Sequence, residues 1–222
     1  VQNAKKINMY NQYAQVLLGY TASHGDGIRK FESDLTLDNS GVMREGFFIS
    51  LSRLLTKDQI KKGSFSITLG VGTWNAPFDT TVQLKDVSAS ITDTSIATSD
   101  GGDYGVLYNV TGAKGDSHGV IFYQAGVVFI SSSAFMSGAL SQSQFNAPHQ
   151  GTAKMWGVQS SLRSGSISSS CDAFRHRIQN LAFNNTTEIN SNIYFCRVPH
   201  NKFNYSANPT YVSSSKIVVK NR

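Results

Sequence analysis

A strong indication of local structure is the segment Val120-Ile-Phe-Tyr-Gln-Ala-Gly-Val-Val-Phe-Ile130. Two runs of β-branched and aromatic residues, which favour strands, flank a Gln-Ala-Gly turn. A short connection that contains glycine is typical of an antiparallel β-hairpin. The surrounding stretch, Gly119–Ser131, is therefore predicted to form two paired strands.

Strand signals continue on both sides of this hairpin. Apolar residues alternate in Gly46–Leu54 and again in Ser64–Val71. A period of two predicts half-buried strands, and we expect Phe47, Ile49 and Leu51 to face the same core as Phe65, Ile67 and Leu69. Further strands are predicted at Thr81–Val87, Tyr104–Val110, Asn192–Val198 and Lys216–Lys220.

Helical spacing is less frequent. Apolar residues recur every three or four positions in Lys5–Leu18 and in Cys171–Phe183, the latter with Ser170 as its predicted N-cap. Thr56–Gly63 resembles one or two helical turns, with Thr56 as N-cap and Gly63 as the stop. A short helical stretch is expected in Ser131–Ser143, and a serine-rich connection in Ser160–Ser170.

The predicted fold is mainly β, an antiparallel sandwich or bent sheet with about three short helices. Neither a βαβ rhythm nor an internal repeat occurs, and no clear linker divides the chain. We therefore predict a single domain over residues 1–222. Because the chain opens on Val1 and a predicted strand lies close to Arg222, we expect this domain to be part of a longer or processed polypeptide.

The polarity of the chain comes mostly from uncharged residues. Charged residues make up 15% of the 222, against about 25% in an average soluble domain, while 30 Ser, 15 Thr and 16 Asn are present. Neutral polar groups form hydrogen bonds at a contact without the desolvation cost of charges. This composition is consistent with a subunit whose surface is largely covered by neighbours.

The net charge of +6 belongs to the last part of the chain. Residues 131–222 hold nine Lys or Arg and two acidic residues, a net of +7, whereas residues 1–130 have a net of −1. Arg175 and Arg177, which flank His176, are the closest approach to a basic cluster. Nucleic-acid readers gather such charge on one face, so we expect an acidic neighbouring protein rather than nucleic acid as the partner.

Residue patterns that carry catalysis or metal binding are missing from the sequence. It has no Gly-x-Ser-x-Gly motif and no phosphate-binding glycine loop. The five histidines are interpreted as surface or loop residues, Cys171 and Cys196 as buried free thiols, and Asp100-Gly-Gly-Asp103 as a turn rather than a calcium loop. We therefore expect no enzyme activity and no cofactor or metal; a depolymerase that uses Asp100 or Asp103 is the enzymatic alternative.

Several segments resemble virion structural proteins of contractile-tailed, T4-like phages of marine bacteria. They are Gly46–Gly70, Gly102–Tyr108, His118–Ile130 and, most specifically, Asn192-Ile-Tyr-Phe-Cys-Arg-Val-Pro-His-Asn-Lys-Phe-Asn-Tyr-Ser-Ala-Asn-Pro-Thr-Tyr211. Together they cover roughly half of the chain, in the same order as in those proteins. The resemblance implies a non-enzymatic virion component of the tail or baseplate, oligomeric in the particle and held by contacts with other virion proteins. It also implies a polypeptide that continues beyond Arg222.

Candidate interface residues follow from these segments. The turn-rich stretch Phe203–Pro209, which ends on Pro209 as a fixed exit, is either a loop packed on its own domain or an interface element. As an interface element it would use Phe203 and Tyr205 as anchors and Asn204 and Asn208 as hydrogen-bonding partners. The basic pair Arg175 and Arg177 is the other candidate, and the N-terminal helix and C-terminal strand are expected to contact neighbours.

The alternative function is a host-attachment or carbohydrate-binding β-sandwich module. Its candidate stacking platforms are Trp74, Tyr104 and Trp156. A membrane partner is not expected, because no apolar run approaches the roughly 20 residues that span a bilayer.

Overall fold

A computed structural model describes most of the chain, in ten stretches: residues 2–19, 28–34, 40–87, 98–99, 102–111, 116–136, 145, 157–197, 212–213 and 216–217. Its internal contacts divide the chain into two units, Val1–Thr187 and Glu188–Arg222. The prediction of a single domain over 1–222 stays a prediction.

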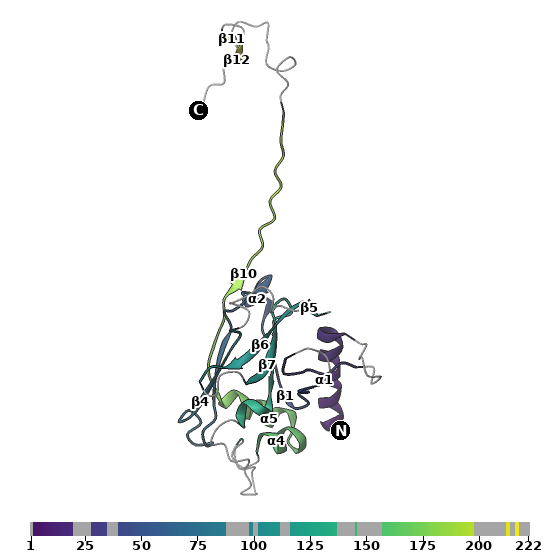
Figure 1. The fold of residues 1–222 in the computed structure, drawn as a ribbon, viewed down its shortest axis with the longest axis vertical. Helices are drawn as coiled ribbons and strands as arrows, with labels where there is room; N and C mark the ends of the chain where they lie inside the picture. The colour runs from purple at the N-terminus through teal and green to yellow at the C-terminus, as the bar shows by residue number, and fades with distance from the viewer. Residues whose placement is uncertain are drawn as a thin grey trace. The chain divides into compact units, whose positions relative to one another are not determined.

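The first unit is built on one antiparallel sheet that curls into a half-barrel (Figure 1). Its strands follow the order β1-β8-β7-β6-β4-β3-β9. Their bounds are β1 Gly46–Ser50, β3 Ser66–Gly70, β4 Thr81–Lys85, β6 Gly102–Asn109, β7 Ser117–Phe122, β8 Val127–Ser131 and β9 Ile178–Ala182. The short strand β5, Thr98–Ser99, pairs with β6. The predicted mainly β, antiparallel fold is therefore confirmed.

The hairpin expected in Gly119–Ser131 forms the centre of this sheet as β7 and β8. Val120 lies opposite Phe129 and Phe122 opposite Val127, and Gly126 takes a positive φ of 66° in the turn between the strands. Every residue of β8 is buried. A strand buried on both faces needs a continuous apolar run rather than an alternating one, which explains the composition of this segment.

Two apolar clusters cover the two faces of the sheet. Phe47, Ile67, Leu69, Ile121 and Val128 belong to the first cluster, and Ile49 and Leu51 pack against it. The second cluster joins Val120, Phe122, Val127 and Phe129 to Ala14, Leu17 and Leu18 of the N-terminal helix. The expectation that the segments at 47–51 and 65–69 share a core is confirmed by the first cluster.

The helix predicted at Lys5–Leu18 is present as α1, Gln2–Leu18. Tyr10 anchors it, because its ring packs edge-on against Phe31 and Phe129 and its hydroxyl donates to the Met43 carbonyl at 2.9 Å. Lys6 donates from Nζ to the carbonyls of Leu162 and Gly165. Within the first unit, these contacts hold α1 against the sheet and against the segment that carries Leu162 and Gly165.

The helix predicted at Thr56–Gly63 is wrong in position. The helical turn is α2, Arg53–Thr56, and Ser52 caps it by accepting from the Leu54 N–H at 3.3 Å. Beyond it, β2 (Gln59–Ile60) pairs with β10 (Asn185–Thr186), and Gly63 takes a positive φ of 75° in a turn. The tertiary pairing of β2 outweighs the weak helical preference of this segment.

Two expectations for residues 160–183 are also corrected. The serine-rich stretch is not a plain connection, because α4 occupies Val158–Ser164 and α5 begins at Ile167 with Ser166 as its N-cap. The predicted helix over Cys171–Phe183 ends early, since α5 stops at His176 and the chain continues as β9. Phe174 in the helix belongs to the first cluster, and Leu181 in the strand packs against it. The apolar spacing that predicted one helix is therefore shared by a helix and a strand.

Short elements complete the described residues. The helical stretch expected in Ser131–Ser143 is a 3₁₀ turn, η2, at Ser132–Phe135, and residues 137–143 lie outside the described part. In the second unit, the strand predicted at Asn192–Val198 is not formed over residues 192–197. There β11 (Val212–Ser213) pairs with β12 (Lys216–Ile217), which agrees with the start of the predicted strand at Lys216. Among the described helices, none is long and apolar enough to cross a bilayer.

Candidate functional site

The predicted interface segment around Phe203, Asn204, Tyr205, Asn208 and Pro209 lies outside the described residues. Its assignment stays a prediction. Residues 188–197, which precede it in the chain, are described, and they have the features of an interface segment.

Residues 188–197, which we name the arm, expose large apolar side chains. Ile189 is 88% exposed, Ile193 75%, Tyr194 83% and Phe195 91%. No helix or strand is formed in the arm. Soluble proteins rarely leave contiguous apolar groups in water unless they mark an interaction site, so the arm is the first candidate functional segment.

The second candidate is the edge of the main sheet at β1. The Leu51 N–H donates to the Gly126 carbonyl and the Ser132 N–H to the Glu45 carbonyl, which assigns the odd-numbered residues of this strand to the pairing with β8. The N–H and C=O groups of Gly46, Phe48 and Ser50 therefore point away from β8. Within the described sheet, β1 ends the strand order and has no second neighbour.

Arg177 does not belong to a surface cluster, and its predicted interface role is wrong. Its side chain is completely buried; Nε donates to the Phe145 carbonyl at 3.1 Å, and Nη1 donates to the carbonyls of Gly70 and Gly72 at 3.0 and 2.8 Å. The guanidinium carbon lies 5.2 Å from the centre of the Phe145 ring. Burial lowers the pKa of Arg177 to about 10. The residue holds three chain segments together inside the protein.

Arg175 is exposed and forms an ion pair with Asp172 one turn earlier on α5. It remains a candidate contact for an acidic partner. The two arginines differ because α5 ends at His176 and the chain turns there into β9, which directs Arg177 into the core.

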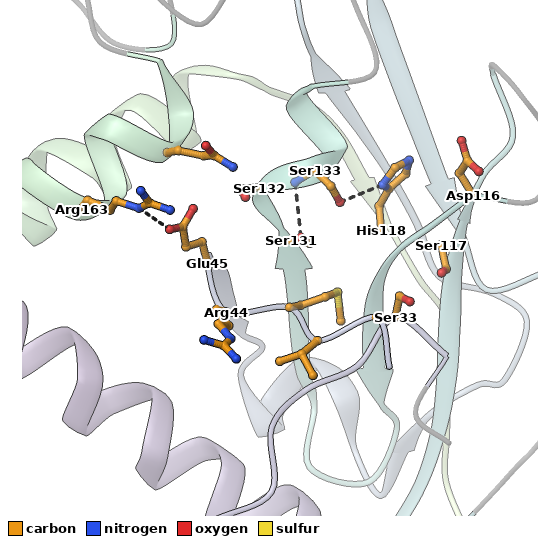
Figure 2. Close-up of a pocket in the computed structure, with 14 residues that line it drawn as sticks. Ser33, Arg44, Glu45, Asp116, Ser117, His118, Ser131, Ser132, Ser133 and Arg163 are labelled. Atoms are coloured by element: carbon orange, nitrogen blue, oxygen red, sulfur yellow. Dashed lines mark hydrogen bonds and ion pairs between the residues drawn. The ribbon is translucent and has the colours of Figure 1, made fainter. Parts of the chain in front are cut away.

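A polar pocket of about 640 Å³ lies where the ends of β7 and β8 meet η2, α4 and the segment before β1 (Figure 2). Serine hydroxyls and charged side chains dominate its lining. The lining residues are Ser33, Gly41, Val42, Met43, Arg44, Glu45, Asp116, Ser117, His118, Ser131, Ser132, Ser133, Gln159 and Arg163. They come from five separate parts of the chain, so no local sequence signal marks the pocket.

His118 and Ser133 form the main side-chain pair of the pocket. His118 Nδ1 lies 3.0 Å from Ser133 Oγ, as Figure 2 shows. Burial lowers the pKa of His118, and the charge of Asp116 partly opposes this effect. The ring is therefore neutral near pH 7, and its buried Nε2 has no hydrogen-bond partner in the part of the chain that the structure describes. The expectation that this histidine is a surface or loop residue is wrong, because it sits in β7 and is 7% exposed.

The surroundings of Ser133 and His118 bear on the chemistry of this pair. A nucleophilic serine needs a base that a third group orients and backbone donors for the developing oxyanion. The Ser133 N–H already donates to Ser131 Oγ at 3.3 Å, and none of the described residues places an acceptor at Nε2 of His118. Hydroxyl groups and the neutral imidazole can instead form hydrogen bonds with a polar group that enters the pocket.

The charges around the pocket are largely balanced. Arg163 donates from Nε to Glu45 Oε1 at 2.5 Å, as drawn in Figure 2. Arg44 and Asp116 supply one further charge of each sign to the lining. The pocket therefore lacks the excess of one charge that would select a strongly charged ligand.

Asp103, named with Asp100 in the enzymatic alternative, forms an ion pair with Lys62 at 2.7 Å; Asp100 lies outside the described residues. Nearby, Asp86 is 1% exposed and accepts from the Gly63 N–H at 2.7 Å and from the Tyr123 hydroxyl at 3.1 Å. Burial raises the pKa of Asp86. Asp86 thus fixes the turn at Gly63 onto the core.

The proposed carbohydrate platforms are poorly available. The Trp74 ring is half-buried and stacks on His176 with ring centres 4.3 Å apart. Tyr104 is 7% exposed within the second cluster, and Trp156 lies outside the described residues. A sugar ring needs an open aromatic face; His176 covers one face of Trp74, and Tyr104 is buried.

The cysteines differ from expectation in burial. Cys171 and Cys196 are free thiols, but both are exposed. Cys171 lies on the solvent side of α5 while Ala173 and Phe174 face the core, and Cys196 lies in the arm.

Within the described part of the chain, no group of three His, Cys, Asp or Glu side chains is arranged to hold a metal ion. No protein-family model, no curated protein and no solved structure matches this chain.

Proposed function

We propose that this protein is a structural component of a tailed-phage virion, in the tail or baseplate, and that it acts through protein–protein contacts without catalysis. The exposed arm carries this proposal. Four large apolar side chains within seven residues are at least 75% exposed, and burying them against a neighbour would stabilise an assembly by about 1.5–3 kcal/mol for each side chain. The arm also contains the first residues of the segment Asn192–Tyr211, which resembles those virion proteins most specifically.

The mode of contact that suits the arm is strand addition. An extended peptide that joins an open sheet edge gains main-chain hydrogen bonds for affinity and side-chain pockets for specificity. The low charged fraction of 15% supports extensive coverage by neighbours, because a free domain keeps more charge on its surface. An acidic neighbour is proposed for the basic C-terminal part, where Arg163 and Arg175 are exposed.

Immunogold labelling of purified phage particles tests the proposal. Antibodies raised against residues 1–222 are expected to label the tail or baseplate, and antibodies against a non-virion phage enzyme serve as control. If the chain is expressed during infection but no particle is labelled and no peptide of it is found in purified virions, the proposal is wrong.

A further inference from the structure

We propose that the polar pocket beside η2 binds an uncharged polyhydroxyl ligand, a saccharide unit. This inference goes beyond the assembly function proposed above, and the lining residues all belong to the first unit. The pocket volume of about 640 Å³ falls within the range of roughly 300–1,000 Å³ that is usual for small-molecule sites. The pocket is separate from Trp74 and Tyr104, the described residues among the predicted stacking platforms.

Ser132 provides an inward-facing hydroxyl that has no partner in the described part of the chain. The residue is only 6% exposed, and none of the described residues forms a hydrogen bond with its side chain. Its oxygen is not among the unpartnered side-chain atoms that are completely buried, so it opens into the pocket that Ser132 lines. Buried polar groups normally have a hydrogen-bond partner, and a ligand in the pocket would supply one.

A carboxylate, a guanidinium and an amide stand beside this hydroxyl. The Ser132 N–H donates to the Glu45 carbonyl at 2.9 Å, which places the two residues side by side. Arg163 donates from Nε to Glu45 Oε1 at 2.5 Å, and Figure 2 shows this pair next to Ser132. Gln159, which also lines the pocket, lies one turn before Arg163 on the same face of α4.

Contacts outside the pocket hold this wall in place. Lys6 of α1 donates from Nζ to the carbonyls of Leu162 and Gly165 at the C-terminal end of α4. At the start of η2, Ser131 Oγ accepts from the Ser133 N–H at 3.3 Å. Groups that are fixed before a ligand arrives lose less conformational freedom on binding, so the wall is suited to a small ligand.

The pair of His118 and Ser133 offers a hydrogen bond of either direction. His118 Nδ1 lies 3.0 Å from Ser133 Oγ, and a neutral imidazole nitrogen is a donor in one tautomer and an acceptor in the other. In both cases the Ser133 hydroxyl can form a further bond with a ligand. A ligand hydroxyl fits either case, because it donates and accepts as well.

The balance of charge in the lining disfavours a charged ligand. Arg163 is paired with Glu45, and Arg44 and Asp116 add one charge of each sign. An anion or a cation in the pocket would therefore meet a like charge as well as an opposite one. A neutral ligand with many hydrogen-bonding groups avoids this conflict.

The uncharged part of the lining favours a saccharide among neutral ligands. None of the described lining residues is Phe, Tyr or Trp, the side chains on which nucleobases stack. Val42 and Met43 instead give a short apolar strip, which suits the C–H face of a sugar ring. Sugar hydroxyls both donate and accept, and they can therefore bond the carboxylate, the amide, the guanidinium and the serine hydroxyls alike.

Binding of monosaccharides to the full-length chain tests the proposal. The probes are glucose, galactose, mannose and N-acetylglucosamine, measured by saturation-transfer NMR. At least one of them is expected to bind with a Kd of about 10 mM or tighter. The uronate and the amino sugar of the same ring are the charged comparison, and both should bind at least about threefold more weakly.

Two substitutions locate the bound sugar. Ser132→Ala and Gln159→Leu each remove hydrogen-bonding groups from the wall and are expected to weaken binding about three- to tenfold. Because the Ser132 hydroxyl has no partner among the described residues, Ser132→Ala should leave the urea midpoint unchanged, which separates lost binding from lost folding. Ser50→Ala and Gln179→Leu are the matched controls at exposed positions of β1 and β9, and both should bind as the native chain does.

Failure of every neutral sugar to bind overturns the proposal. Charged relatives that bind as tightly as the neutral sugar overturn it as well. So does binding that both pocket substitutions leave unchanged, because the sugar would then occupy another place. These measurements use the isolated chain, so their outcome is independent of whether the protein is found in virions.

Discussion

At the scale of single residues, Arg177 is a buried cation whose contacts are carbonyl groups of the chain itself. Replacing it with Ala leaves the carbonyls of Phe145, Gly70 and Gly72 without this donor in the core, and each unsatisfied buried group costs about 1–3 kcal/mol. Arg177→Ala is expected to lower the free energy of unfolding by about 3 kcal/mol or more in urea titrations. Arg175→Ala, which removes only an exposed ion pair, should change it by less than about 1 kcal/mol; equal effects of the two substitutions would contradict this assignment.

The burial of His118 predicts how the stability of the protein depends on pH. Burial holds its pKa below the ordinary value in the folded state, so the unfolded chain binds a proton first as the pH falls. The contribution of neutral His118 to the free energy of unfolding is therefore fully present above the ordinary histidine pKa of about 6.5. It is lost as the pH falls below that value. Unfolding of the native protein and of His118→Asn at about pH 7.5 and pH 5.5 should show a smaller loss in the variant. An equal loss in both proteins would assign the pH dependence to other groups.

At the scale of elements, β1 depends on the close approach of Gly46 to β8. A Cβ at this position would lie 2.4 Å from the Ile130 carbonyl oxygen and 2.7 Å from the Phe129 ring, so β1 would have to move away from β8. Gly46→Ala is expected to lower the free energy of unfolding by about 2 kcal/mol. Ser50→Ala, at the exposed end of the same strand, should stay within about 0.5 kcal/mol. Thermal or urea unfolding of both variants measures the difference.

Individual helices and strands also show which structural features could be predicted from the sequence. The hairpin at Gly119–Ser131 was predictable because its composition and its glycine turn indicate the same structure. The segment 171–183 was not, since Phe174 and Leu181 reach the same core whether the chain is one helix or a helix followed by a strand. The pocket and the burial of Arg177 depend on residues that lie far apart in the chain, and no local pattern encodes those contacts. The exposure of the arm was likewise hidden, because Ile193-Tyr-Phe-Cys196 has the composition of an ordinary buried strand.

At the scale of the whole molecule, the arm is expected to control self-association. Phe195→Asp removes an apolar group that the proposed assembly contact buries, a loss of about 2 kcal/mol, which corresponds to roughly thirtyfold weaker association. Asn190→Asp is the matched control, because it adds the same negative charge to the arm at an exposed polar residue and removes no apolar group. Sedimentation equilibrium of full-length chains should show weaker association for Phe195→Asp alone. If both variants associate as the native chain does, the arm is not the contact.

The proposal as a whole is that this chain is an assembly subunit of a tailed-phage virion whose arm contacts a neighbouring protein. We would test it with a cryo-electron-microscopy map of the intact phage particle. We predict density for the half-barrel sheet in the tail or baseplate, with the arm packed against a neighbouring protein. A map in which this fold is present but the arm contacts no neighbour would contradict the proposed contact, and particles that lack the chain altogether would contradict the virion function.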